Sequence, residues 1–279
     1  MRSTPSRRAR LYIGILIAAV VAAAAVTVIL RLGSDGDDAG TAASIGVTTV
    51  PVPDESPFLD LAVYYPKIEE LPEDDPVNIA LQSLVLDDLA GYEDFARQEA
   101  EALGTTEEVG AYAIDESRAV VESHEGFVSV ALLVQQGLYH GMGDSYWLST
   151  TVDINEARPV EIWELLIADR RPMAIFTQLV ILELLKDDGI CEDMLLENNF
   201  LNGIYSNYGG GLPYEEWDEH VNEYTYIDYA VTGEGIFVAF DEYGIGSGAC
   251  GSMSTLIEWP VVEDYLSDYG RTVFETAAG

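Results

Sequence analysis

Basic residues are scarce in this chain, and lysine is almost absent. The 279 residues hold 13 Lys and Arg against 49 Asp and Glu, a formal net charge of −36, and the only lysines are Lys67 and Lys186. A negative field of this size repels nucleic-acid phosphates and anionic lipid head groups, which argues against both as partners of the folded part. The same field attracts cations and cationic proteins. It is equally typical of a solvated surface that serves solubility or tolerance of salt.

The few basic residues are also unevenly placed. Five of the 13 lie near the N-terminus, namely Arg2, Arg7, Arg8, Arg10 and Arg31. The remaining eight basic residues face all 49 acidic ones, so the chain beyond residue 31 has a net charge of −41. Residues 11–30 carry no charge at all. Twenty apolar residues, each rising about 1.5 Å, span roughly 30 Å, the thickness of a bilayer core.

The arginine-rich start and the apolar run predict one transmembrane helix. Positive charge before the helix retains the N-terminus in the cytoplasm, so we expect the remainder on the extracytoplasmic side of the cell membrane. A cleaved signal peptide is the alternative, with cleavage near residues 22–25. The apolar run is longer than the core of a signal peptide, about 7–15 residues, and therefore favours an uncleaved anchor. Either interpretation places the folded part outside the cytoplasm.

Cysteine is nearly absent too, with Cys191 and Cys250 as the only two. In an oxidising compartment an even pair is expected to form a disulfide bond. The alternative is a redox or nucleophilic pair. The two residues lack the CxxC spacing of that chemistry, so the sequence favours the disulfide.

Composition divides the chain into five parts. Residues 1–10 form a short cytoplasmic tail, 11–30 the anchor, 31–57 a flexible stalk, 58–270 one extracytoplasmic domain and 271–279 a tail. The stalk is assigned because this stretch is rich in Gly, Ser, Thr, Asp and Pro and shows no helical or strand period. The domain is long enough to bury a sizeable core.

Hydrophobic patterning predicts an α+β domain with antiparallel strands and packed helices. Asp75 and Pro76 indicate a helix start and Gly104 its end, with an apolar stripe between them, and Gly91 is a candidate break within it. Strands are expected at residues 58–65, 118–122, 127–136, 146–154, 224–232, 236–240 and 252–258, and further helices at 161–167, at 172–186 and from Pro260 onward.

Three groups of short motifs follow one another along the chain. The first is Tyr65-Pro66-Lys67-Ile68, ahead of the helix that holds Asn78. The second is Gly137-Leu138-Tyr139-His140-Gly141, ahead of Thr151-Val152-Asp153. The third runs from Phe240-Asp241-Glu242-Tyr243-Gly244-Ile245 to Gly251 and on to Ile257-Glu258-Trp259-Pro260. Together they resemble the extracytoplasmic domain of RsiV-type proteins, over about residues 58–267. Leu138 and Tyr139 depart from the family pattern, which usually has smaller residues there.

The RsiV-type domain occurs in lysozyme-responsive anti-sigma factors, in some peptidoglycan deacetylases and in a secreted mycobacterial immunogenic antigen. The resemblance implies an RsiV-like α+β ectodomain behind the anchor. An anti-sigma factor needs a cytoplasmic sigma-binding domain, for which residues 1–10 are too short, and a deacetylase needs a separate catalytic domain. We therefore expect a membrane-anchored sensing or binding module that is not an enzyme, with lysozyme or another cationic protein as its ligand. The alternatives are a glycan-acting enzyme of the cell wall and an accessory envelope protein whose acidic surface only confers solubility.

Aromatic residues around a glycine run are the candidate ligand contacts. Gly209, Gly210 and Gly211 lie among four aromatic side chains, Tyr205, Tyr208, Tyr214 and Trp217. Tyr and Trp are strong anchors at interfaces, so these four are expected to contact a ligand. The alternative is an irregular loop that packs its aromatic side chains into the core.

The sequence predicts no catalytic residue, cofactor or metal site. His124, His140 and His220 lack both metal-ligand spacing and a nucleophile signature, and we interpret them as turn or surface residues. The acid run at residues 69–75 contains Pro72 and lacks the glycine and terminal glutamate of a calcium loop. A pair of glycosidase carboxylates is defined by separation in space, which the sequence does not give.

Overall fold

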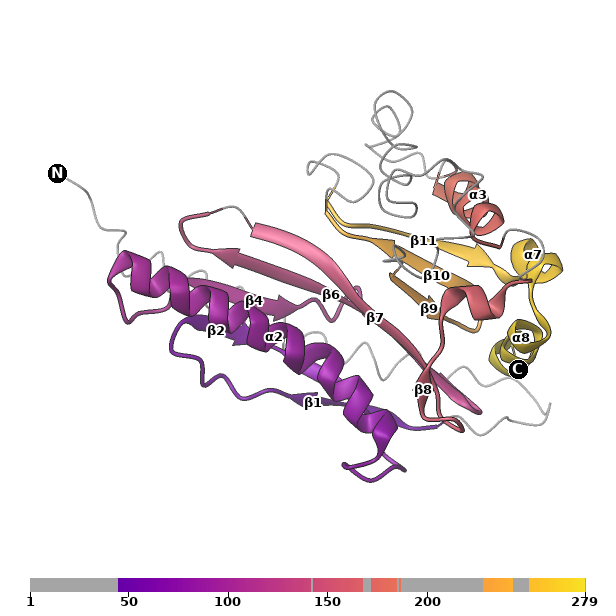
Figure 1. The fold of residues 1–279 in the computed structure, drawn as a ribbon, viewed down its shortest axis with the longest axis horizontal. Helices are drawn as coiled ribbons and strands as arrows, with labels where there is room; N and C mark the ends of the chain where they lie inside the picture. The colour runs from indigo at the N-terminus through magenta and orange to yellow at the C-terminus, as the bar shows by residue number, and fades with distance from the viewer. Residues whose placement is uncertain are drawn as a thin grey trace. The chain divides into compact units, whose positions relative to one another are not determined.

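The computed structural model describes residues 45–141, 143–167, 172–184, 186, 228–242 and 251–278. The chain divides into two compact units, Met1–Thr41 and Ala42–Gly279, and all described residues belong to the second. Their strands form a two-stranded, a three-stranded and a six-stranded sheet (Figure 1). Helices pack on these sheets, which confirms the predicted α+β class with antiparallel pairing.

The six-stranded sheet has the spatial order β2-β4-β6-β7-β8, with β5 also paired to β6. Its strands are β2 (Leu59–Ala62), β4 (Gly110–Ile114), β5 (Val120–His124), β6 (Phe127–Leu138), β7 (Gly143–Asp153) and β8 (Arg158–Pro159). One pair departs from the antiparallel expectation, because β2 and β4 run parallel. Parallel neighbours need a crossover connection, and helix α2 (Pro76–Leu103) supplies it.

Helix α2 begins and ends where the sequence predicts. The carboxylate of Asp75 accepts a hydrogen bond from the backbone N of Val77 (2.9 Å), and Gly104 ends the helix in a left-handed conformation with φ of 66°. Gly91 does not divide the helix, which continues through it. The apolar stripe of α2 covers one face of the six-stranded sheet (Figure 1).

Asn78 ties the first turn of α2 to β3 (Tyr64–Ile68). Its Oδ1 accepts from the backbone N of Ile68 (2.8 Å), and its Nδ2 donates to the carbonyl oxygens of Ile68 (3.1 Å), Leu71 (3.2 Å) and Pro72 (2.9 Å). The side chain is buried, so the amide satisfies backbone groups that water cannot reach. This contact links the Tyr65-Pro66-Lys67-Ile68 motif to the helix that follows it.

Strand β6 is buried on both faces because each face is covered by a different element. Val130, Leu132 and Val134 belong to the core beneath α2. Ala131 and Leu133 belong to a second cluster with Trp147 of β7 and residues of the three-stranded sheet. Side chains alternate between the faces of a strand, so a continuous apolar run is what a strand covered on both sides requires.

The three-stranded sheet has the order β11-β10-β9. Its strands are β9 (Asp228–Val231), β10 (Gly235–Phe240) and β11 (Met253–Glu258). β9 is one of its two edge strands, and side chains of the larger sheet accept hydrogen bonds from the free edge of β9. The backbone N of Tyr229 donates to Oγ of Ser149 (3.0 Å), and the backbone N of Val231 donates to Oγ of Ser129 (3.0 Å). An edge strand covered in this way cannot pair with another chain.

Short helices complete the core of the C-terminal part. They are the 3₁₀ helices η1 (Ile162–Leu165) and η5 (Glu263–Tyr265) and the α-helices α3 (Pro172–Leu184), α7 (Trp259–Val262) and α8 (Asp268–Ala278). The segment expected to be helical over 161–167 is therefore only one 3₁₀ turn. The predicted tail at 271–279 is also not a tail as far as it is described, because α8 buries Val273 and Ala277.

The predicted stalk is partly structured. β1 (Val47–Pro51) pairs antiparallel with β3, which differs from a flexible segment over 31–57. Its Val-Thr-Thr-Val sequence has high strand propensity and finds a partner in β3. The expected first strand at 58–65 is two strands, β2 and β3, and β3 continues through Pro66. Proline is tolerated there because β1 and β3 form a sheet of only two edge strands.

Two predictions about the membrane and the cysteines fall outside the described residues. They are the anchor at residues 11–30 and the disulfide bond between Cys191 and Cys250. Among the helices that are described, none combines the length and apolar character needed to cross a membrane.

Candidate functional site

The residues predicted from sequence to contact a ligand are not placed by the structure. Tyr205, Tyr208, Tyr214 and Trp217 all lie outside the described residues, as does His220.

The other two histidines are in or beside turns. The His124 Nε2 lies 3.2 Å from Oε2 of Glu122, and its ring lies 5.1 Å from that of Phe127. The same Glu122 oxygen accepts from the backbone N of Gly233 (2.7 Å), so the group connects β5 to the β9–β10 turn. His140 lies exposed between β6 and β7. Neither histidine adjoins a metal site, and the described residues contain no group of three or more His, Cys, Asp or Glu side chains that would hold a metal ion.

The acid run before α2 has structural contacts of its own. Glu70 accepts a hydrogen bond from the backbone N of Gly46 (3.0 Å), Glu73 pairs with Lys67 (3.1 Å), and Asp75 caps the helix. These contacts attach β1 and β3 to the helix start.

A groove lies between α2 and the neighbouring strands β6 and β7. Its volume is about 500 Å³, and seven residues line it, namely Asp87, Asp88, Gly91, Tyr92, Phe95, Gln136 and Tyr146. The hollow results from the spacing of the residues along α2. Asp87, Gly91 and Phe95 are four residues apart and share one helical stripe, so the missing side chain of Gly91 leaves a notch between a carboxylate and a ring. A Cβ built on Gly91 would have no atom within 4 Å.

Two tyrosine hydroxyls fix the carboxylate of Asp88. Tyr112 of β4 and Tyr146 of β7 both donate to its Oδ2, at 2.6 Å and 2.5 Å. Burial, and then the hydrogen bond to Asp88, raise the pKa of both tyrosines above its ordinary value, so both hydroxyls keep their protons and remain donors. The side chain of Asp88 is therefore held in one orientation. A fixed carboxylate loses less conformational entropy when it binds a cation.

Aromatic rings form the wall beside this carboxylate. The ring of Tyr92 lies 5.8 Å from that of Phe95 and 5.8 Å from that of Tyr112. Phe95 is 45% exposed, which is unusual for a large apolar side chain and places its ring at the rim of the groove. The groove thus combines negative charge with exposed aromatic surface.

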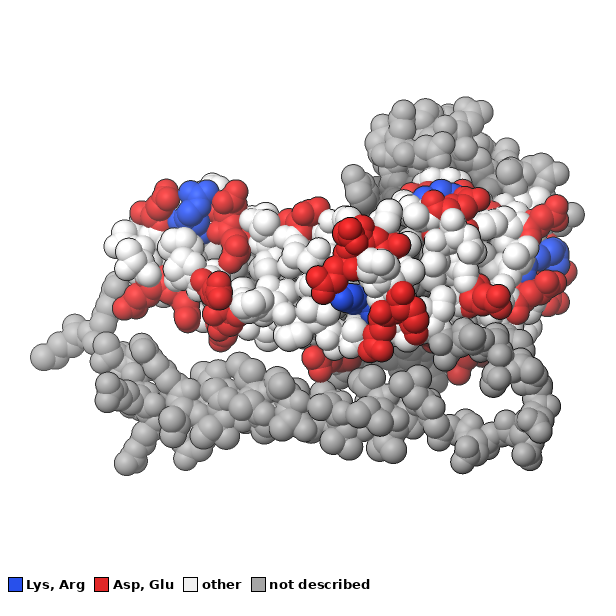
Figure 2. Space-filling model, turned by 90° about the horizontal axis from the view of Figure 1, so that it is seen from below, with Lys and Arg blue, Asp and Glu red and all other residues white. Residues whose placement is uncertain are grey.

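Within the described residues, no basic side chain neutralises the charge of the groove. Basic side chains elsewhere are engaged by their own partners: Lys67 pairs with Glu73, Arg97 with Asp94 and Glu101, Arg158 with Glu156 and Glu164, and Lys186 with Glu183. In the part of the chain that the structure describes, no basic side chain forms an ion pair with Asp87 or Asp88. Figure 2 shows acidic side chains in several groups over one face, with few basic ones between them.

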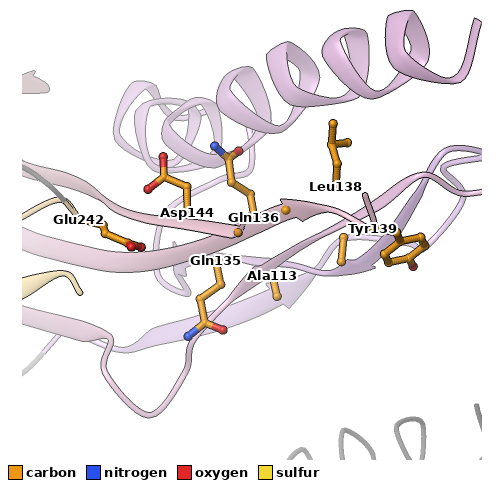
Figure 3. Close-up of a pocket in the computed structure, with 10 residues that line it drawn as sticks. Ala113, Gln135, Gln136, Leu138, Tyr139, Asp144 and Glu242 are labelled. Atoms are coloured by element: carbon orange, nitrogen blue, oxygen red, sulfur yellow. The ribbon is translucent and has the colours of Figure 1, made fainter. Parts of the chain in front are cut away.

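A second hollow, of about 420 Å³, opens beside the same strands. Figure 3 shows Gln136 pointing to the helix side of β6 and Gln135 to the opposite side. Small residues contribute much of its lining, namely Ala111, Ala113, Gly137 and Gly143. Among the described residues that line it, Tyr139 is the single aromatic one. The groove on α2 is the stronger candidate because it joins a fixed carboxylate to several rings.

Two further carboxylates lie at the contact between the sheets. Asp228 accepts from Oγ of Ser149 (2.9 Å), and Asp241 accepts from the backbone N of Trp147 (2.8 Å). Burial, together with the charge of Asp241, raises the pKa of Asp228 to about 7. Burial also raises the pKa of Asp241. Neither residue lines either of these two hollows, and their hydrogen bonds connect the segments that carry them to β7.

Comparison with known proteins identifies structures that share the fold. No protein-family model matches the sequence, and no curated protein matches it. A crystal structure of a DUF3298 family protein from Pseudomonas aeruginosa PAO1 is similar, with 15% identity over 83% of this chain and 98% of that chain and a TM-score of 0.50. A DUF3298 family protein from Bacteroides fragilis NCTC 9343 has 12% identity over 86% of this chain and 100% of that chain, with a TM-score of 0.47. At 15% identity, the Pseudomonas structure establishes a shared mixed α+β fold and nothing finer.

The sequence did contain a local signal for the groove. Asp87, Gly91 and Phe95 follow the four-residue spacing of a helix stripe, with glycine between an acid and an aromatic residue. That spacing shows a notch on a helix. It does not show that Tyr112 and Tyr146 reach Asp88, because these residues lie 24 and 58 positions away in the chain.

Proposed function

We propose that this protein is a binding module of the cell envelope, anchored in the membrane by residues 11–30 with its N-terminus in the cytoplasm and its folded domain outside. The arginines at positions 2, 7, 8 and 10 before an uncharged run of twenty residues support this orientation. The ligand is a cationic protein, and lysozyme is the first example to test. The domain is of the RsiV type, a finer assignment that rests on the motif order and agrees with the observed α+β fold.

The observation that carries the proposal is the groove on α2. An acidic surface alone is explained by solubility, since it needs no particular arrangement. The groove is a particular arrangement, because it places the fixed carboxylate of Asp88 and the exposed one of Asp87 beside the rings of Tyr92 and Phe95. A hollow with convergent polar groups and aromatic walls is typical of binding sites. The surrounding negative charge would speed the approach of a cationic protein.

The test is a titration of the full chain, held in a nonionic detergent, with lysozyme at low and at physiological salt. We expect a saturable one-to-one component that persists at physiological salt, since groove contacts are screened less than surface charge. Gly91→Leu would fill the notch and remove this component. Ala90→Leu, at an exposed position on the same helix, is the matched control and should bind as the natural chain does. Binding that vanishes with salt, or that Gly91→Leu leaves intact, would overturn the proposal and favour a merely solubilising surface.

A further inference from the structure

We propose that the groove selects a lysine side chain of its partner over an arginine. This inference rests on the proposed function, because it specifies the part of a cationic protein that enters the groove. It goes further in assigning the chemistry of that contact to Asp88 and its two tyrosines.

The first argument concerns the free lone pairs of Asp88. A carboxylate oxygen accepts about two hydrogen bonds, and both hydroxyls, those of Tyr112 and Tyr146, are directed to Oδ2. Among the described groups none donates to Oδ1, which remains available. A guanidinium pairs most strongly with a carboxylate through two parallel hydrogen bonds, one to each oxygen. That fork is blocked here, while an ammonium needs only the single oxygen that is left.

The second argument concerns the walls of the groove. The rings of Tyr92, Phe95 and Tyr146 line it, and the face of an aromatic ring attracts a cation. A compact ammonium group fits among several rings, and the four-carbon stem of lysine can lie along the exposed ring of Phe95 while its charged end reaches Asp88. The volume of about 500 Å³ is large enough for one such side chain.

The third argument is that this lysine must come from a partner. The chain has two lysines, and both are engaged elsewhere. Lys67 pairs with Glu73 at 3.1 Å, and Lys186 pairs with Glu183 at 2.6 Å. The groove therefore presents an acceptor for which this chain provides no lysine.

The experiment compares two forms of lysozyme that carry the same charge. Treatment with O-methylisourea converts lysines to homoarginines, which replaces each ammonium with a guanidinium. We expect the full chain to bind native lysozyme about tenfold more tightly than the guanidinated form at physiological salt, a loss typical of one charged contact. Equal affinity for both forms would overturn the lysine preference and leave the proposed function standing. Absence of binding to either form would overturn the proposed function, and this inference with it.

Variants then assign the preference to the groove. Asp88→Asn retains an oxygen that can accept from the tyrosines but removes the charge, so the difference between the two lysozymes should disappear. Glu275→Gln removes one charge from an exposed position on α8 and should preserve the difference. Phe95→Ala should weaken binding of native lysozyme severalfold. The ring of Phe95 is 45% exposed, so its removal should not cause misfolding. A preference that survives both Asp88→Asn and Phe95→Ala would place the lysine contact elsewhere and refute this assignment.

Discussion

The hydroxyl of Ser149 donates to Oδ1 of Asp228 across 2.9 Å and accepts from the backbone N of Tyr229 at 3.0 Å. One side chain of β7 thus holds the beginning of β9 by two hydrogen bonds. The carboxyl it binds is one whose pKa burial raises to about 7, with the charge of Asp241 as the second cause. The contact between the two sheets is therefore sensitive to pH near neutrality.

Asp228→Asn should make the chain less sensitive to pH. The carboxyl has an ordinary pKa of 3.8, so below pH 4 it is protonated in both folded and unfolded chains. Between pH 4 and pH 7 the unfolded chain has lost this proton while the folded chain retains it, so stability falls as pH rises. We expect the variant to exceed the natural chain in free energy of unfolding at pH 8, by on the order of a few kcal/mol, and to approach it at pH 4. Urea denaturation at both pH values measures this, and an equal difference at both would contradict the interpretation.

Ser129→Ala should destabilise the second contact along the same edge of β9. The hydroxyl of Ser129 accepts from the backbone N of Val231 (3.0 Å) and lies 2.7 Å from the hydroxyl of Thr151, all in a buried environment. Alanine leaves a buried N–H without an acceptor, which costs about 1–3 kcal/mol. The control is Ser117→Ala, which removes an exposed hydroxyl and should change stability by less than about 0.5 kcal/mol. If Ser129→Ala lowered the free energy of unfolding as little as Ser117→Ala does, water would have replaced the Ser129 hydroxyl as the acceptor.

Asn78→Ala should cost more than an ordinary helix substitution. The amide makes four hydrogen bonds to the backbone of β3 and of the connection that follows. Their loss leaves several backbone groups unpaired in a buried place, and we expect a decrease of about 2 kcal/mol or more in the free energy of unfolding. Gln98→Ala, at an exposed position of the same helix, should be nearly neutral. Urea denaturation of the two variants measures this difference. Equal midpoints would show that the hydrogen bonds of Asn78 do not stabilise the fold.

Gly91→Ala should stabilise the chain while it narrows the groove. Alanine is favoured over glycine within a helix by about 1 kcal/mol, and a Cβ at this position meets no atom within 4 Å. The urea midpoint should therefore rise. A gain in stability accompanied by weaker lysozyme binding would indicate that glycine is kept for the groove at a cost in stability. A fall in the midpoint would show that the helix is strained here in a way its geometry does not reveal.

Local chemistry explains which features the sequence could predict. The helix from Asp75 to Gly104 was predicted because its cap and its end lie within the segment itself. The alternating pattern of β7 likewise identified that strand. β1 was missed because a short Val-Thr segment becomes a strand only when a partner such as β3 is available.

The candidate site was harder to predict from the sequence than the fold. Its carboxylate and notch are local to α2, but the tyrosines that orient Asp88 come from β4 and β7, whose position beside the helix is set by the whole fold. The predicted aromatic contacts at Tyr205, Tyr208, Tyr214 and Trp217 lie outside the described residues and stay a prediction.

Because β6 is buried on both faces, the two faces of its sheet are covered in a definite order as the chain folds. All strands of the six-stranded sheet and α2 lie before residue 160, whereas the three-stranded sheet that covers the other face begins at Asp228. A chain that is synthesised from its N-terminus can fold the face covered by α2 first. The contacts of that face also join residues that are closer together in the sequence. Until β9 arrives, Ala131, Leu133 and Trp147 remain without their cover. A newly made chain thus passes through a stage with an exposed apolar sheet face, at which self-association competes with folding and a chaperone would bind.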